Sequence, residues 1–111
     1  MAAKRTVKFA PHILAEVRLL PTEAGGRKEP TPPDVFVCQM GGGGEYFELR
    51  MDLSGIGSLS PGSKARVPIR FSRPEYILPW IGVGTEFSLR ESRETGKIGG
   101  GKILEVYDLA A

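Results

Sequence analysis

Residues 96–102, with the sequence G-K-I-G-G-G-K, match the G-x-x-x-x-G-K pattern with which P-loops hold nucleotide phosphates. The next residue is Ile103, however, where magnesium binding needs a Ser or Thr hydroxyl. A P-loop must also open a helix whose N-terminal amides face the phosphates. Nine residues follow Lys102, and they have the pattern of a strand. We therefore expect a glycine-rich turn or bulge here, with no nucleotide and no other cofactor.

The single histidine, His12, and the single cysteine, Cys38, are the next candidates for catalysis. A thiolate nucleophile needs a histidine beside it and a third group to orient that histidine. Cys38 lies in an apolar stretch, where a small buried residue is the ordinary explanation. One His and one Cys would also leave most ligands of a zinc site to carboxylates, which is unusual. We expect no enzyme, no catalytic residues and no metal site, unless Cys38 is solvent-reactive with His12 alongside.

Residues 76–81, with the sequence Y-I-L-P-W-I, form the densest apolar run of the chain. The proline within the run argues against a central strand. Two roles remain open for this segment, and we favour burial, the first of them. It folds back to close one end of the fold, as apolar loops commonly do, or it exposes Tyr76 and Trp80 as aromatic anchors for a partner.

Glycine and proline decide which elements can position these residues. The chain has 15 Gly and 9 Pro among its 111 residues, about twice the average usage. Both residue types interrupt long helices and favour turns between short strands. A chain of this length holds one domain, which we place at residues 1–111 with its core at about 7–109.

Alternation of apolar and polar residues with period 2 predicts half-buried strands. The clearest case is residues 45–53, where Phe47, Leu49, Met51 and Leu53 share one face. We expect strands at residues 15–19, 35–40, 45–53, 64–71, 85–90 and 102–109. Pro68 cannot donate a ladder hydrogen bond, so its strand should lie at an edge or carry a bulge there. Six short strands without helical periodicity predict an all-β fold, namely a small closed barrel without exposed edges.

Charge and cysteine content exclude several protein classes. The chain has 15 Lys plus Arg against 13 Asp plus Glu, a formal net charge of +2. That balance does not fit a purely electrostatic binder of nucleic acid or membranes. No segment approaches the roughly 20 apolar residues that span a bilayer. A single cysteine excludes an intramolecular disulfide framework, so we expect a cytoplasmic protein.

Four short motifs, in order along the chain, resemble the third, C-terminal domain of bacterial elongation factor Tu. That domain opens with a strand A/S-E-V-x-x-L and a loop E-G-G-R. It continues with an M-P-G turn, a strand G-L-R-F-A-I-R-E and a closing V-G-A-G-V-V. The corresponding segments here are 15–20 (A-E-V-R-L-L) with 23–27 (E-A-G-G-R), 59–62 (L-S-P-G), 84–91 (G-T-E-F-S-L-R-E) and 98–103 (I-G-G-G-K-I). The matches cover nearly the whole chain, and the resemblance implies a six-stranded antiparallel barrel.

The resemblance also implies candidate contacts. In the family, this barrel helps to hold the T-stem of aminoacyl-tRNA and packs against a GTPase domain. The match places Arg27 where the family contacts the tRNA backbone, and Glu91 and Ser92 where it faces the T-stem. The chain departs from the family at residues 28–31 and 92–97, and the GTPase domain is absent, so we expect no GTP hydrolysis.

These observations predict a non-catalytic binding module connected with translation. Its partner is another protein, contacted through Tyr76, Trp80 and Arg27. The alternative is an RNA-binding barrel with tRNA as its partner and phosphate contacts that weaken with salt. We expect neither a nucleotide nor a membrane partner. The nucleic-acid surface of that alternative consists of Arg27, Arg90, Glu91, Ser92, Arg93 and Lys97.

Overall fold

The computed structural model describes residues 9–42, 44–92 and 96–107. Six strands follow one another along this part of the chain: β1 (Ile13–Leu19), β2 (Val35–Gly42), β3 (Glu45–Asp52), β4 (Lys64–Phe71), β5 (Glu86–Arg90) and β6 (Gly99–Val106). A 3₁₀ turn, η1 (Thr22–Ala24), follows β1. A single-turn helix, α1 (Pro74–Ile77), runs directly into a second 3₁₀ turn, η2 (Leu78–Trp80), between β4 and β5.

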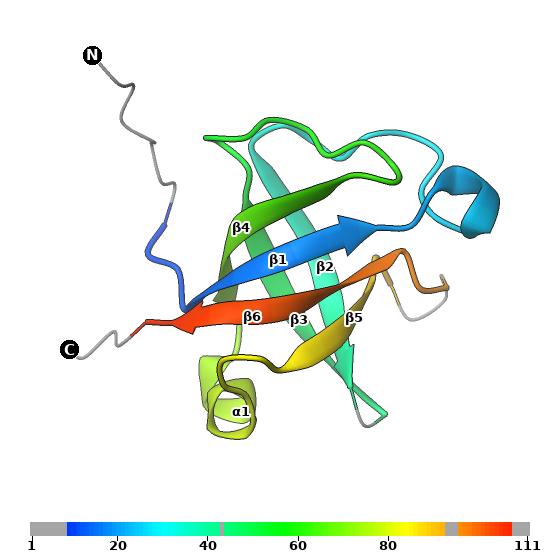
Figure 1. Ribbon diagram of the computed structural model, residues 1–111. Helices are drawn as coiled ribbons and strands as arrows, with labels where there is room; N and C mark the ends of the chain where they lie inside the picture. The colour runs from blue at the N-terminus through cyan, green and yellow to red at the C-terminus, as the bar shows by residue number, and fades with distance from the viewer. Residues whose placement is uncertain (1–8, 43, 93–95, 108–111) are drawn as a thin grey trace, which may run out of the picture.

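The strands close into a barrel in the order β1-β4-β3-β2-β5-β6, with β6 returning to β1 (Figure 1). Every neighbouring pair is antiparallel. Closure gives each strand two neighbours, which removes the exposed edges of an open sheet. The predicted all-β, six-stranded antiparallel closed barrel is therefore confirmed.

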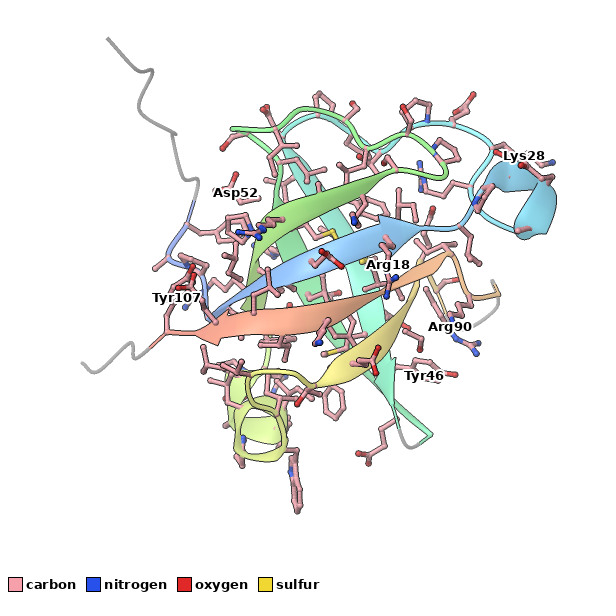
Figure 2. The ribbon with its side chains drawn as sticks, in the orientation of Figure 1. Arg18, Lys28, Tyr46, Asp52, Arg90 and Tyr107 are labelled. Carbon is pink, nitrogen blue, oxygen red and sulfur yellow. The ribbon has the colours of Figure 1, made fainter. Side chains whose placement is uncertain are left out.

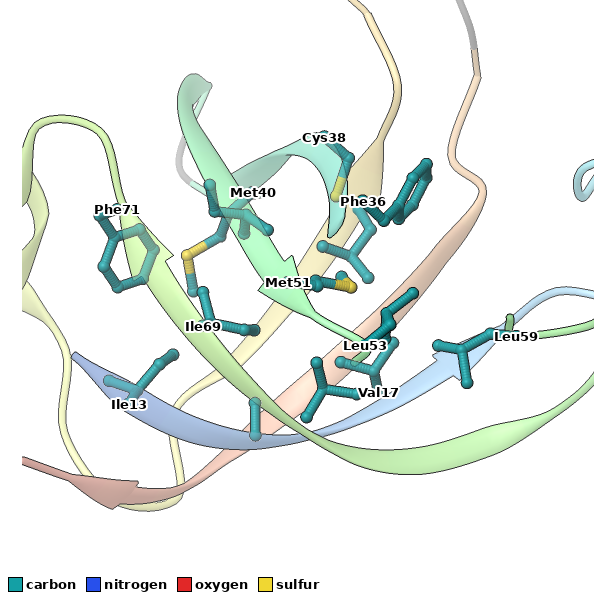
Figure 3. Packing of buried hydrophobic residues seen from close by; sticks show 14 of the residues in the cluster. Ile13, Val17, Phe36, Cys38, Met40, Met51, Leu53, Leu59, Ile69 and Phe71 are labelled. Carbon is teal, nitrogen blue, oxygen red and sulfur yellow. The ribbon is translucent and has the colours of Figure 1, made fainter. Parts of the chain in front are cut away.

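The barrel interior contains the apolar residues that the alternation of the sequence assigned to one face. Ala15, Val17 and Leu19 of β1 are buried, as are Leu49 and Met51 of β3. Figure 3 shows side chains from different strands meeting across the interior, among them Val17, Met51 and Ile69. Burial of such side chains contributes about 1.5–3 kcal/mol each, so this continuous core is the main stabilisation of the barrel.

Pro68 lies in β4 at a position where only one neighbouring strand is in register. It pairs with Leu14 of β1, whereas the pairing between β3 and β4 begins at Ile69. The predicted edge strand or bulge is wrong, because β4 has a neighbour on each side and no register shift; the missing amide hydrogen of Pro68 is tolerated because no residue of β3 pairs with it.

The last strand differs from its predicted bounds. Gly99, Gly100 and Gly101 lie inside β6 and pair with both β1 and β5, so the predicted start at residue 102 is wrong. These glycines are required by close approach: a Cβ on Gly101 would lie 2.7 Å from the carbonyl oxygen of Glu16 and would also meet the ring of Phe87. The glycine-rich turn or bulge expected for these glycines is therefore wrong, and residues 99–102 of the P-loop pattern lie in β6.

None of the helices among the described residues is both long and apolar enough to cross a membrane.

Candidate functional site

The segment formed by α1 and η2 closes one end of the barrel and also exposes two aromatic rings. Ile77 packs into the core with 6% of its surface exposed, whereas Tyr76 is 59% and Trp80 81% exposed. The two roles that the sequence left open are therefore divided between neighbouring residues, and the expectation of burial is wrong for Trp80. One turn of helix points Ile77 inward and leaves the aromatic residues on either side of it facing outward.

Backbone hydrogen bonds hold this segment in place. The amide of Tyr76 donates to the carbonyl oxygen of Arg73 over 3.1 Å. Further along, the amide of Gly82 donates to Oγ1 of Thr85 over 3.0 Å, and the amide of Gly84 donates to the carbonyl oxygen of Ile103 over 2.8 Å. The loop that carries Trp80 is thus tied to the barrel on its C-terminal side, so the exposed indole is presented from a defined backbone.

A hollow opens beside Trp80 because β2 and β5 separate near their ends. Their pairing stops at Gly41 and Ser88, although β5 starts at Glu86 and β2 continues to Gly42. Phe87 of β5, which lies beyond this point, and Phe47 of β3, which pairs with Met40 just before it, are only partly buried and line the opening. Figure 1 shows α1 and the β2–β3 hairpin on either side of the lower end of the barrel.

We call this hollow the Trp80 groove. Its volume is about 380 Å³, and its floor is apolar and aromatic. A wider hollow shares Glu45, Phe47 and Trp80 with it and extends to Tyr46 and Tyr76. The groove is lined by Met40, Gly41, Glu45, Phe47, Ile77, Trp80, Ile81, Thr85, Glu86 and Phe87.

Arg27, predicted as a partner contact, is largely occupied within the protein. Its Nε donates to the carbonyl oxygen of Glu29 over 3.1 Å, and its Nη2 donates to that of Pro30 over 3.3 Å. Its Nη1 pairs with the carboxylate of Glu91, and its guanidinium carbon lies 5.0 Å from the ring centre of Phe36. With 17% of its side chain exposed, Arg27 fixes the loop after β1 against the end of β5.

The other described residues of the predicted nucleic-acid surface lie at the end of β5 and just before β6, where the amide of Ile98 donates to the carbonyl oxygen of Leu89 over 2.8 Å. Arg90 lies at the end of β5 with its guanidinium 4.8 Å from the ring centre of Tyr46 (Figure 2). Ser92 is half-buried just after β5. Lys97 is exposed and lines a separate hollow with Arg18 and the glycines of β6. Glu91 forms the ion pair with Arg27 described above. Arg93 lies outside the described residues.

Nδ1 of His12 accepts a 2.9 Å hydrogen bond from the backbone amide of Phe71. Its ring stacks on the Phe71 ring, with centroids 6.0 Å apart. Burial and the nearby charge of Arg70 lower the pKa of His12. Cys38 is 1% exposed, and burial raises the pKa of its thiol to about 12 against a smaller opposing effect of Arg27. A neutral buried thiol is a poor nucleophile, so this geometry disfavours Cys38 as a reactive centre.

No three His, Cys, Asp or Glu side chains within the described ranges converge as a metal site would require. Of the residues that line the groove and the wider hollow, the sequence singled out Trp80 and Tyr76 as contacts but missed Phe47, Phe87, Glu45 and Glu86. Alternation correctly places Phe47 on the inward face of its strand. It carries no signal that β2 and β5 separate there, because strand separation depends on which strands become neighbours.

No protein-family model and no curated protein matches this chain.

Proposed function

We propose that this chain is a non-catalytic protein-binding module of the cytoplasm. In this view it is a free-standing barrel similar to the C-terminal domain of elongation factor Tu and acts in translation. The six-stranded antiparallel barrel is the fold that the resemblance implies. The observation that carries the proposal is the exposed ring of Trp80, which lines an apolar groove and, with Tyr76, the wider hollow beside it.

Exposed tryptophan beside an open groove fits a binding site for physical reasons. Trp and Tyr dominate the energy of protein interfaces, because they bury large areas with few rotatable bonds. Trp80 contributes little to the core in the described structure, since four-fifths of its surface faces solvent. A bound partner would cover this surface and fill the hollow beside it.

Protein is favoured over RNA as the partner because two arginines of the predicted RNA surface, Arg27 and Arg90, already contact other groups of the protein. The charge of Arg27 is neutralised by Glu91, and Arg90 stacks on Tyr46. Phosphate binding depends on free cationic groups whose counterions are released on contact. An engaged arginine must first give up its partner within the protein.

Affinity capture with matched variants tests the proposal. Tagged wild-type protein, Trp80→Ala and Val37→Ala are incubated with nuclease-treated lysate. Val37 is the control, because it is an exposed apolar residue on β2 outside the groove. We expect proteins that the wild type and Val37→Ala retain and Trp80→Ala loses. Equal capture by all three proteins would refute the assignment to the Trp80 groove.

One observation favours RNA as a second candidate. Arg18 and Lys97 are exposed and line a hollow of about 640 Å³ whose wall includes the backbone of Gly99, Gly100 and Gly101. Two exposed cations beside accessible backbone could contact a phosphate chain. A filter-binding titration with tRNA at low salt tests this candidate: affinity should fall steeply with salt and with Lys97→Gln, and absence of binding at low salt excludes it.

A further inference from the structure

We infer that the Trp80 groove takes a cationic peptide segment of a partner protein, in which a Lys or Arg side chain is flanked by apolar residues. This inference rests on the protein-binding function proposed above and specifies the chemistry of the partner.

The charged residues that line the groove are acidic although the whole chain is positive. The formal net charge is +2, but the charged residues lining the groove and the adjoining wider hollow are Glu45 and Glu86, with no Lys or Arg. Neither carboxylate forms an ion pair or a side-chain hydrogen bond with any described residue. Lys102 lies opposite Glu86 in the register of β5 and β6 without forming an ion pair with it. Two free carboxylates at an apolar opening complement a cation.

The aromatic lining suits the same ligand. The face of an indole attracts an ammonium or guanidinium group within about 6 Å of its centre, and Trp80 lies at the rim where such a group would remain partly hydrated. The floor between Phe47 and Phe87 accepts apolar neighbours or the methylene stem of the Lys or Arg side chain. An anionic or purely polar segment would satisfy neither the carboxylates nor the floor.

The strand geometry favours an extended segment. Beyond Ser88, β5 pairs with β6 through Phe87 and Glu86 but has no pairing with β2. Among the described residues, the edge of β5 that faces the groove therefore has no strand partner at Phe87 and Glu86. An extended peptide could add backbone hydrogen bonds there while alternate side chains point into the groove.

Trp80 makes the inference directly measurable, since it is the only tryptophan of the chain. Three capped hexapeptides without tryptophan serve as probes: one alternates Lys and Leu, the second replaces Lys by Gln, and the third replaces Lys by Glu. Trp80 emission is followed during titration at about 10 mM salt, where charges interact over a long range. We expect a saturable blue shift with the Lys peptide and at least about fivefold weaker binding of the other two peptides.

Two variants with equal change in charge separate local from global electrostatics. Glu45→Gln with Glu86→Gln removes both rim carboxylates. Glu23→Gln with Glu29→Gln removes two exposed carboxylates of the loop after β1, outside the groove. We expect the first pair to weaken Lys-peptide binding by about fivefold or more, and the second pair to change it less than twofold.

The outcomes distinguish this inference from the function on which it rests. Equal binding of Lys and Gln peptides at Trp80 would overturn the cationic assignment and leave a protein-binding groove. No emission change with any peptide would also overturn it, whereas Trp80-dependent capture from lysate would still support protein binding.

An emission shift that depends on protein concentration alone would identify a second copy of this chain as the occupant. A shift with an oligoribonucleotide in place of the peptide would point to RNA. Either of these last two results overturns the inference.

Discussion

The ring of Phe87 lies in the space that a side chain on Gly101 would occupy. The two residues pair in register between β5 and β6. Because Gly101 has no Cβ, Phe87 can lean over β6 while it also lines the Trp80 groove. Because Phe87 contacts β6 and also lines the candidate site, a side chain at position 101 should displace the Phe87 ring and change the shape of the groove.

Gly101→Ala should destabilise the barrel by about 1–3 kcal/mol, the usual cost of overpacking. The new methyl group would meet the Phe87 ring and the backbone oxygen of Glu16. Gly82→Ala is the matched control, because a Cβ there has no heavy atom within 4 Å and its φ is not left-handed. Urea unfolding of both variants checks the prediction, which fails if the two lose equal stability.

Arg27→Ala should destabilise the protein by about 1–3 kcal/mol, since it removes two hydrogen bonds to carbonyl oxygens and the contact with Phe36. Glu91→Gln should cost less than about 1 kcal/mol, because its partly exposed ion pair is screened by solvent. Thermal unfolding compares them. If Glu91→Gln costs as much as Arg27→Ala, the ion pair and not the loop contacts dominates.

The single histidine signal in an NMR titration should have its midpoint below the ordinary value of 6.5, because burial and Arg70 lower the pKa of His12. A lowered pKa means that the folded state binds this proton less readily than the unfolded state. The resulting stability is present above pH 6.5 and is lost as pH falls through the folded pKa. His12→Gln retains an acceptor but cannot titrate, so its stability should fall less over the same range. A His12 midpoint above 6.5 would contradict this prediction.

The Cys38 thiol should lower stability at alkaline pH. Its pKa rises from 9.0 to about 12 on folding, so the folded state retains a proton that the unfolded state loses. The contribution of the protonated thiol to the free energy of unfolding is complete below pH 9. It is lost as pH rises toward 12, by up to about 1.4 kcal/mol per pH unit. The difference in free energy of unfolding between wild type and Cys38→Ala should therefore shrink over this range. Rapid labelling of the native thiol at pH 8 would show instead that Cys38 is accessible.

The sequence predicts the barrel because its strands are half-buried, and half-burial gives alternation, as in β1 and β3. Strand β6 is harder to predict, because Gly99, Gly100 and Gly101 have no side chains that could alternate. Trp80 and Tyr76 stand out by composition alone. Glu45, Glu86 and the two phenylalanines of the groove do not, because they meet only through the separation of β2 and β5. The engagement of Arg27 by Glu91, 64 residues away, depends equally on the tertiary fold.

Site-specific photocrosslinking in cells tests the central claim most directly. A benzoylphenylalanine in place of Tyr76 lies at the rim of the wider hollow beside Trp80, and one in place of Lys28 lies on the loop after β1 as a control (Figure 2). We predict a discrete protein adduct from position 76 that disappears when Trp80→Ala is added, and no such adduct from position 28. The absence of an adduct at position 76, or an adduct there that survives Trp80→Ala, would contradict a protein-binding function of the Trp80 groove.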